Sequence, residues 1–178
     1  SNQYLLLRLF RDYLDDDITI LIKEHPRQFK KNSARNQSYR SKYFYTELQS
    51  LKNVYLLDQK FHTKDILMHP KLEGILTVRG NIILVAFFNN IPSFTIGKSL
   101  WNELPCVYDC NHIENLKNIN SLIKSRNKKT PSDSLKLKKI KTLIKKGFLS
   151  RQFLFNLKNK ELEMFNQYFL KLIQSVLS

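Results

Sequence analysis

Two short cationic segments contain the residue types that bind phosphate. The first is residues 23–27, which read Lys-Glu-His-Pro-Arg. An imidazole N–H can donate a hydrogen bond to a phosphate oxygen, and neighbouring cations neutralise the charge of the group that it holds. Further cations follow along the chain, at Lys30, Lys31, Arg35, Arg40 and Lys42. Taken alone, the imidazole of His25 also fits a purely structural role near a strand end.

The second cationic segment is Arg79-Gly80-Asn81, which joins an apolar run to a predicted helix. Backbone N–H groups at the start of a helix offer positive potential to an anion, and a glycine allows a close approach. Taken alone, this pattern also fits a simple turn. The case for either segment therefore depends on the elements that position it.

The sequence gives little support to metal, disulfide or nucleophilic chemistry. Cys106 and Cys110 lie four residues apart, with His112 close by. A structural zinc site needs four ligands in recognisable pairs, and a disulfide framework belongs to small, cysteine-rich secreted chains. We therefore expect two reduced thiols in a cytoplasmic protein, no metal and no cofactor. Neither a P-loop nor a Ser/His/Asp set can be assembled from the residues present.

Short apolar runs alternate with helical patterns along the first hundred residues. The predicted strands are residues 18–22, 54–57, 74–78 and 93–96. The predicted helices are residues 2–14, 41–51, 63–68 and 82–89. This alternation predicts an α/β fold with a Rossmann-like parallel sheet of four or more strands. Because ligands bind outside the carboxyl ends of parallel strands, we expect His25 and Gly80 to open on one crevice.

The carboxyl-terminal part of the chain has a helical pattern and most of the charge. Predicted helices span residues 111–124, 131–146 and 158–176. The 178 residues include 30 Lys or Arg and 15 Asp or Glu, a net charge of +15. Thirteen of these cations and one acid lie within residues 121–160. We predict a Rossmann-like domain at residues 1–125 and a basic helical extension, packed on it, at residues 126–178.

Four segments, in this order, carry a family resemblance: Ile20-Leu-Ile-Lys-Glu-His-Pro26, Asn53-Val-Tyr-Leu-Leu57, Thr77-Val-Arg-Gly-Asn81 and Asn90-Ile-Pro-Ser-Phe-Thr-Ile-Gly97. Over residues 1–125 the chain resembles the nucleotide-sugar half of the bacterial capsule polysaccharide biosynthesis family. The resemblance implies half of a GT-B fold in a glycosyltransferase. Its donor would be a nucleotide-activated sugar, with CMP-sugars favoured, and it would need no metal.

The resemblance also implies roles for individual residues. Those that would hold the nucleotide or its phosphate lie in the two cationic segments: Lys23, His25, Pro26, Arg27, Arg79, Gly80 and Asn81. His25 would contact the phosphate, while Lys23 or Arg27 would give electrostatic support. The base that activates the acceptor, a growing glycan or lipid, would come from an amino-terminal domain. Since the chain begins Ser-Asn-Gln and reads as an excised piece, we expect no transfer activity from it alone.

This sequence departs from the family pattern at three places. Val85 stands where the family usually carries a glutamate, Gly80-Asn81 replaces a common Ser-Thr pair, and Asn90-Ile91 replaces Gly-Lys. Valine cannot accept a hydrogen bond from a sugar or ribose hydroxyl. Two interpretations stay open: a transferase with a different donor, or a non-catalytic scaffold of polysaccharide assembly.

The basic helices raise the question of a second anionic partner. Six lysines of the predicted helix 131–146 would form an exposed arc opposite an apolar stripe: Lys136, Lys138, Lys139, Lys141, Lys145 and Lys146. The stripe would consist of Leu135, Leu137, Ile140, Leu143 and Ile144. The arc fits peripheral contact with the anionic inner membrane, and it equally fits a solvated face. A spanning helix is excluded, because the longest apolar run, residues 81–88, is about half the length required. A nucleic-acid-binding module is the less favoured alternative, since no recognition motif accompanies the charge.

Overall fold

A computed structural model of the chain describes residues 3–24, 41–78, 80, 82–97, 99–125 and 131–145. The chain divides into two compact units, Ser1–Met68 and His69–Ser178. Both units alternate helices with parallel strands, so the predicted α/β fold is confirmed. The sequence predicts a different division, into parts at residues 1–125 and 126–178, and that boundary stays a prediction.

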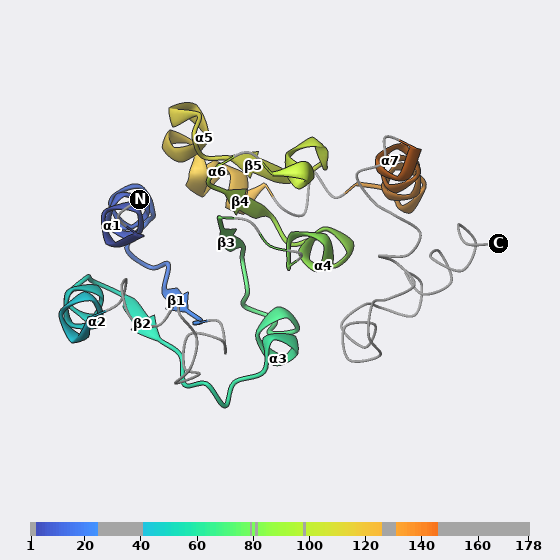
Figure 1. Ribbon diagram of the computed structural model, residues 1–178. Helices are drawn as coiled ribbons and strands as arrows, with labels where there is room; N and C mark the ends of the chain where they lie inside the picture. The colour runs from blue at the N-terminus through green and yellow to red at the C-terminus, as the bar shows by residue number, and fades with distance from the viewer. Residues whose placement is uncertain are drawn as a thin grey trace. The chain divides into compact units, whose positions relative to one another are not determined.

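The first unit is built on a pair of parallel strands. Its elements are α1 (Gln3–Tyr13), β1 (Ile20–Ile22), α2 (Lys42–Gln49), β2 (Val54–Leu56) and α3 (Thr63–Leu67) (Figure 1). Ile20 lies opposite Val54 in the strand register. The buried apolar residues are few: Phe10, Leu48, Val54 and Leu67.

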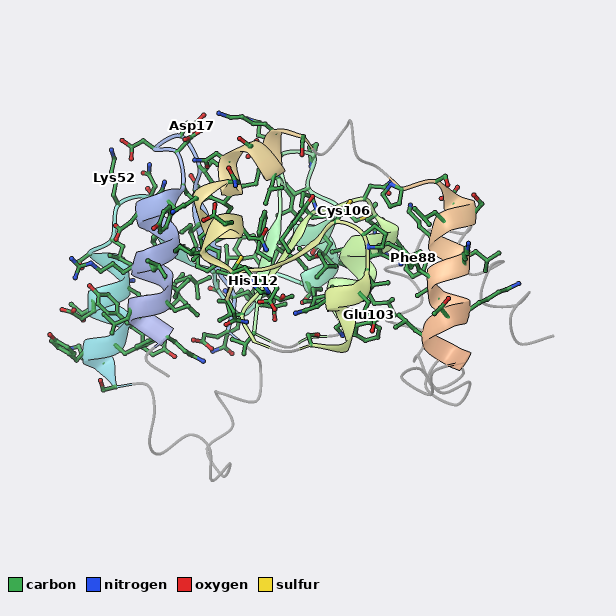
Figure 2. The ribbon with its side chains drawn as sticks, turned by 90° about the horizontal axis from the view of Figure 1, so that it is seen from above. Asp17, Lys52, Phe88, Glu103, Cys106 and His112 are labelled. Atoms are coloured by element: carbon green, nitrogen blue, oxygen red, sulfur yellow. The ribbon has the colours of Figure 1, made fainter. Side chains whose placement is uncertain are left out.

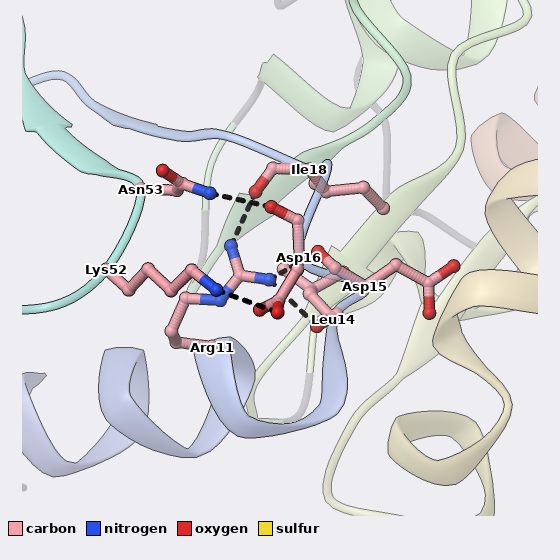
Figure 3. Close-up of polar contacts among 7 residues, drawn as sticks. All are labelled: Arg11, Leu14, Asp15, Asp16, Ile18, Lys52 and Asn53. Atoms are coloured by element: carbon pink, nitrogen blue, oxygen red, sulfur yellow. Dashed lines mark hydrogen bonds and ion pairs between the residues drawn. The ribbon is translucent and has the colours of Figure 1, made fainter.

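A set of polar contacts fixes the turn between α1 and β1 (Figure 3). The Arg11 guanidinium is buried, and it donates hydrogen bonds to the backbone oxygens of Leu14, Asp15 and Ile18 at 2.5–2.8 Å. The Asn53 side-chain amide donates to the backbone oxygen of Asp16 at 2.6 Å. Because the backbone oxygen of Asn53 in turn accepts a hydrogen bond from the backbone N–H of Ile20, these contacts tie the turn to the start of both strands.

The second unit contains a three-stranded parallel sheet in the order β3-β4-β5. Its strands are β3 (Ile75–Thr77), β4 (Ser93–Thr95) and β5 (Val107–Asp109). Its helices are α4 (Ile82–Phe88), the 3-10 helix η2 (Leu100–Glu103), α5 (Ile113–Lys117), α6 (Ile119–Lys124) and α7 (Asp133–Lys145). In Figure 1, α4 lies on one side of this sheet, and α5 and α6 lie on the other.

The core of the second unit surrounds β4 and α4. All three residues of β4 are buried, and so are residues 83–88 of α4. A helix that is apolar on every face is buried on every face, which accounts for the longest apolar run in the sequence. Trp101 and Leu104, in and after η2, add to this core.

Helix α7 packs on the second unit through Lys136, Ile140 and Leu143, which are all buried. The ammonium of Lys136 lies 3.4 Å from the backbone oxygen of Phe88 and 3.4 Å from a carboxylate oxygen of Asp133. Phe88 is the last residue of α4 and lies beside α7 (Figure 2). A lysine therefore supplies a donor to a carbonyl at the end of that helix, where no donor of the helix itself is available.

This packing corrects the predicted faces of α7. Lys136, expected in the exposed arc, is buried, whereas Leu135, expected in the apolar stripe, is 38% exposed. Lys136 is buried because its ammonium donates a hydrogen bond to the backbone oxygen of Phe88, at the carboxyl end of α4. Among the α7 lysines whose side chains the structure describes, Lys138 and Lys141 are exposed and Lys139 is half-buried.

The predicted elements are present with shorter bounds, and three features differ. We expected one sheet of four or more strands, but the described strands pair in two sheets, with β1 and β2 in the first unit and β3, β4 and β5 in the second. Strand β5 was not predicted. The predicted helix 111–124 is two helices that meet at Asn118. The predicted helix 158–176 lies outside the described residues.

Candidate functional site

Only two of the seven predicted site residues fall within the described part of the chain, Lys23 and Gly80. The others lie outside it, and their roles stay predictions: His25, Pro26, Arg27, Arg79 and Asn81. Lys23 belongs to the first unit and Gly80 to the second. The crevice that His25 and Gly80 were expected to share also stays a prediction.

Lys23 directly follows β1 at its carboxyl end. Its ammonium donates a hydrogen bond to the backbone oxygen of Phe61 at 2.6 Å. This contact ties the end of β1 to the segment that precedes α3. An ammonium has three donors, so Lys23 keeps the capacity to bind an anion as well.

Gly80 forms the turn from β3 into α4. A Cβ atom at this position would lie 3.2 Å from the hydroxyl oxygen of Thr77 and 3.3 Å from a methyl carbon of Ile82. The backbone oxygen of Gly80 accepts a hydrogen bond from the N–H of Ile83, at 3.2 Å. The glycine therefore allows the tight path of the chain and leaves the Thr77 hydroxyl against the turn.

Val85, the main departure from the family pattern, is buried in the middle of α4. Its neighbours along the helix, Leu84, Ala86 and Phe87, are buried too. A carboxylate at this position would lose its water without a compensating partner, which is costly. The helix is thus built for an apolar side chain here, and any acid that contacts a ligand has to come from another element.

The last residues of the three strands form a polar row. Thr77, Thr95 and Asp109 end β3, β4 and β5, and the strand register places them opposite one another. Register partners in a parallel sheet point to the same face, about 4.8 Å apart from strand to strand. Thr77 and Asp109 are half-buried, and Thr95 is fully buried. The row lies at the carboxyl edge, where open parallel sheets bind ligands.

Asn102, from η2, connects two members of the row. The Thr95 hydroxyl donates to the Asn102 side-chain oxygen at 3.1 Å, and the Asn102 amide nitrogen donates to Oδ2 of Asp109 at 3.0 Å. The other carboxylate oxygen of Asp109 accepts from the backbone N–H and the side-chain amide of Asn111, at 3.0 and 2.6 Å. The Asp109 carboxylate is therefore held from two sides in one orientation.

Gly97 lies just beyond β4. Its φ is +108°, a conformation that residues with a side chain rarely adopt. Among the described residues, no atom outside its chain neighbours lies within 4 Å of a Cβ built there. The glycine therefore serves the backbone path at the end of the strand rather than a close contact.

The polar row is the feature that sequence reasoning missed. Residues 107–109 end in an acid and follow Pro105, so they do not read as a strand. Because the sequence does not predict β5, it does not place Asp109 at the edge of the sheet. The available signal was the run of polar residues directly after it, Asn111, His112 and Asn115, at the start of a helical pattern.

The two cysteines stand at either end of β5, and neither forms a disulfide. Burial, together with the charge of Asp109, raises the pKa of the Cys110 thiol to about 12. Cys110 is consequently protonated and unreactive at neutral pH. Cys106 and His112 also lie apart (Figure 2). Within the described residues, no group of three or more His, Cys, Asp or Glu could hold a metal ion.

No helix among the described residues is both long and apolar enough to cross a bilayer. No protein-family model, curated protein or solved structure matches this chain.

Proposed function

We propose that the chain binds a nucleotide-activated sugar and is the donor-binding part of a glycosyltransferase for capsular or other surface polysaccharide. The polar row Thr77, Thr95 and Asp109 at one carboxyl edge is the observation that carries the proposal. Hydroxyl and carboxylate groups at such an edge suit the hydroxyls of a ribose or sugar. The resemblance favours a CMP-sugar as the donor.

The proposed mechanism is stabilisation of the leaving nucleotide. As the glycosyl bond breaks, negative charge grows on the phosphate, and donors already aimed at it lower the barrier. One such donor is typically worth about 3 kcal/mol. We assign this role to His25, Arg79 and the backbone amides of Gly80 and Asn81, with Lys23 or Arg27 in support. The acceptor would enter through an amino-terminal domain outside this chain.

Calorimetric titration with CMP, UMP and GMP tests the proposal. We expect one nucleotide to bind saturably. The Thr77→Val variant removes a hydroxyl from the row at nearly constant volume and should weaken that binding, whereas Thr142→Val, on the exposed face of α7, should leave it unchanged. His25→Ala should weaken binding by about 1 to 3 kcal/mol, because a charge-assisted bond is lost. Failure of all three nucleotides to bind would overturn the proposal.

A non-catalytic scaffold of polysaccharide assembly is the second candidate, because Val85 is buried where the family pattern has a carboxylate. A scaffold would bind a partner protein or glycan and no free nucleotide. Binding to unrelated DNA duplexes with a steep salt dependence, again without a nucleotide site, would instead indicate the nucleic-acid module that the +15 charge also permits.

Peripheral contact with an anionic membrane is part of the same proposal. Lys138 and Lys141 face outward from α7, and each lysine near an anionic surface contributes on the order of 1 kcal/mol. We expect binding to vesicles that contain phosphatidylglycerol, none to neutral vesicles, and release by salt. Replacing Lys138, Lys139 and Lys141 by Gln should abolish it, whereas the same change at Lys60, Lys64 and Lys71 should not. Equal binding to both vesicle types would reject the membrane contact.

A further inference from the structure

We infer that Asp109 recognises the ribose of the nucleotide by accepting a hydrogen bond from its 2′-hydroxyl, so that the site selects ribonucleotides over deoxyribonucleotides. The inference rests on the proposed nucleotide binding and adds a specificity-determining residue to it. Among the described acids of the second unit, Asp109 alone ends a strand. It therefore stands at the sheet edge where ligands of parallel sheets lie.

The hydrogen bonds of Asp109 leave one acceptor position available. A carboxylate offers about four lone-pair positions and no donor. Asn111 uses two of them, both on Oδ1, and Asn102 uses one on Oδ2. In the described part of the structure, Oδ2 thus keeps capacity for one more donor. The side chain is half-buried, so a ligand can reach it.

Capping the turn from β5 to α5 does not require all of the hydrogen bonds that Asp109 accepts. The Asn111 contacts and the bond from the Asn115 side chain to the Asp109 backbone oxygen, at 2.7 Å, already fix the turn from β5 to α5. Asn102 adds a contact from a different element, η2, on the side of the carboxylate that the turn does not use. The carboxylate is therefore held in place on its second side as well.

The orientation of Asn102 is itself set by a buried group. The Thr95 hydroxyl, fully buried, donates to the Asn102 oxygen and so turns the amide nitrogen toward Asp109. That nitrogen also lies 3.4 Å from the backbone oxygen of Gly97. A carboxylate fixed in this way before the ligand arrives loses little freedom on binding. Because Val85 is buried in α4 and cannot accept a hydrogen bond, the carboxylate of the site comes from β5 instead.

The experiment compares CMP, UMP and GMP with their 2′-deoxy counterparts by calorimetry. We expect the wild-type chain to bind its preferred ribonucleotide at least about tenfold more tightly than the deoxy form. Asp109→Asn should weaken the ribonucleotide by a similar factor and remove the preference, because the asparagine side chain has one acceptor oxygen in place of two and Asn111 already donates to it. Glu73→Gln, an exposed acid of the same unit, should change neither value. Thermal melting of each variant checks that the fold is kept.

The outcomes separate this inference from the proposed function. Equal binding of the ribo and deoxy forms by the wild-type chain would overturn the inference and leave nucleotide binding in place. A preference that survives in Asp109→Asn would do the same. If Asp109→Asn does not fold, Asp109→Ala replaces it in the same comparison, and equal binding of the two forms by the wild-type chain still overturns the inference. If no nucleotide binds at all, the proposed function fails and the role of Asp109 fails with it.

Discussion

The two parallel sheets of this chain are stabilised in different ways. In the second unit, β4 has a neighbour on each side, and all of its residues are buried. Among the described residues of the first unit, β1 and β2 pair only with each other, and the register pair Leu21 and Tyr55 is 51% and 57% exposed. A parallel sheet usually needs cover on both faces, and a two-stranded sheet is marginal by itself.

The first unit compensates with polar contacts between its turns. Lys52 and Asn53 join the α1–β1 turn to the start of β2, and Arg11 ties the same turn to α1 (Figure 3). We therefore expect substitutions of apolar residues to destabilise the second unit most, and substitutions of polar residues at the turns to destabilise the first unit most.

The largest expected effect is the loss of a core side chain from β4. Phe94→Ala should lower the free energy of unfolding of the second unit by about 3 to 5 kcal/mol, as for other buried aromatic residues. Trp101, the sole tryptophan, is buried in this unit, so its fluorescence during urea unfolding reports the change. Leu21→Ala in the exposed face of β1 is the matched control and should cost less than about 1 kcal/mol. Equal costs at the two positions would contradict the comparison.

The next effect is the loss of the Arg11 guanidinium. Arg11→Met keeps most of the side-chain volume but leaves the backbone oxygens of the α1–β1 turn without their charged donor. Hydrogen bonds to charged groups are worth about 1.5 to 3 kcal/mol, and we expect a loss in that range for the first unit. Hydrogen exchange of residues 14–18 measures it. Arg8→Met, an exposed arginine on the same helix, should leave the exchange unchanged.

Alkaline pH should weaken the second unit through Cys110. Burial raises the pKa of this thiol from 9.0 to about 12, so the folded state keeps a proton that the unfolded state loses. Stability is therefore full below about pH 9 and falls as the pH rises toward 12, by at most about 1.4 kcal/mol per pH unit. Burial also raises the pKa of Tyr108, which adds to the loss at the upper end.

Urea unfolding at about pH 8.5 and about pH 10.5 measures this slope. Cys110→Ala should reduce the slope, and Cys106→Ala, at the other end of β5, is the matched control. An unchanged slope in Cys110→Ala would assign the alkaline weakening to other groups.

The sequence predicted what depends on local patterns. Apolar triplets such as Ile20–Ile22 and the continuous apolar run of α4 predicted the alternation of strands and helices. It did not predict what depends on partners distant in the chain. Lys136 is buried because the carbonyl of Phe88, on another helix, needs a donor. Asp109 belongs to the candidate site because β4 pairs with β5, and no local pattern of residues 107–109 indicates that pairing.

The smallest expected effect concerns the exposed ion pair of the first unit. Lys52 lies 2.7 Å from Asp16, and its hydrogen bond and charge lower the pKa of the Asp16 carboxyl below the ordinary value of 3.8. A carboxyl with a lowered pKa adds stability above its unfolded pKa and loses that stability as the pH falls through the folded pKa. Because both side chains are well exposed, solvent screening keeps the contribution small. An NMR titration should place the Asp16 midpoint below the ordinary value of 3.8, and Lys52→Gln should raise the midpoint toward that value. High salt should have the same effect as the substitution, since it screens exposed charges. A midpoint that does not change in Lys52→Gln would show that the ion pair adds nothing to the turn, and Arg11 and Asn53 would then hold the turn without it.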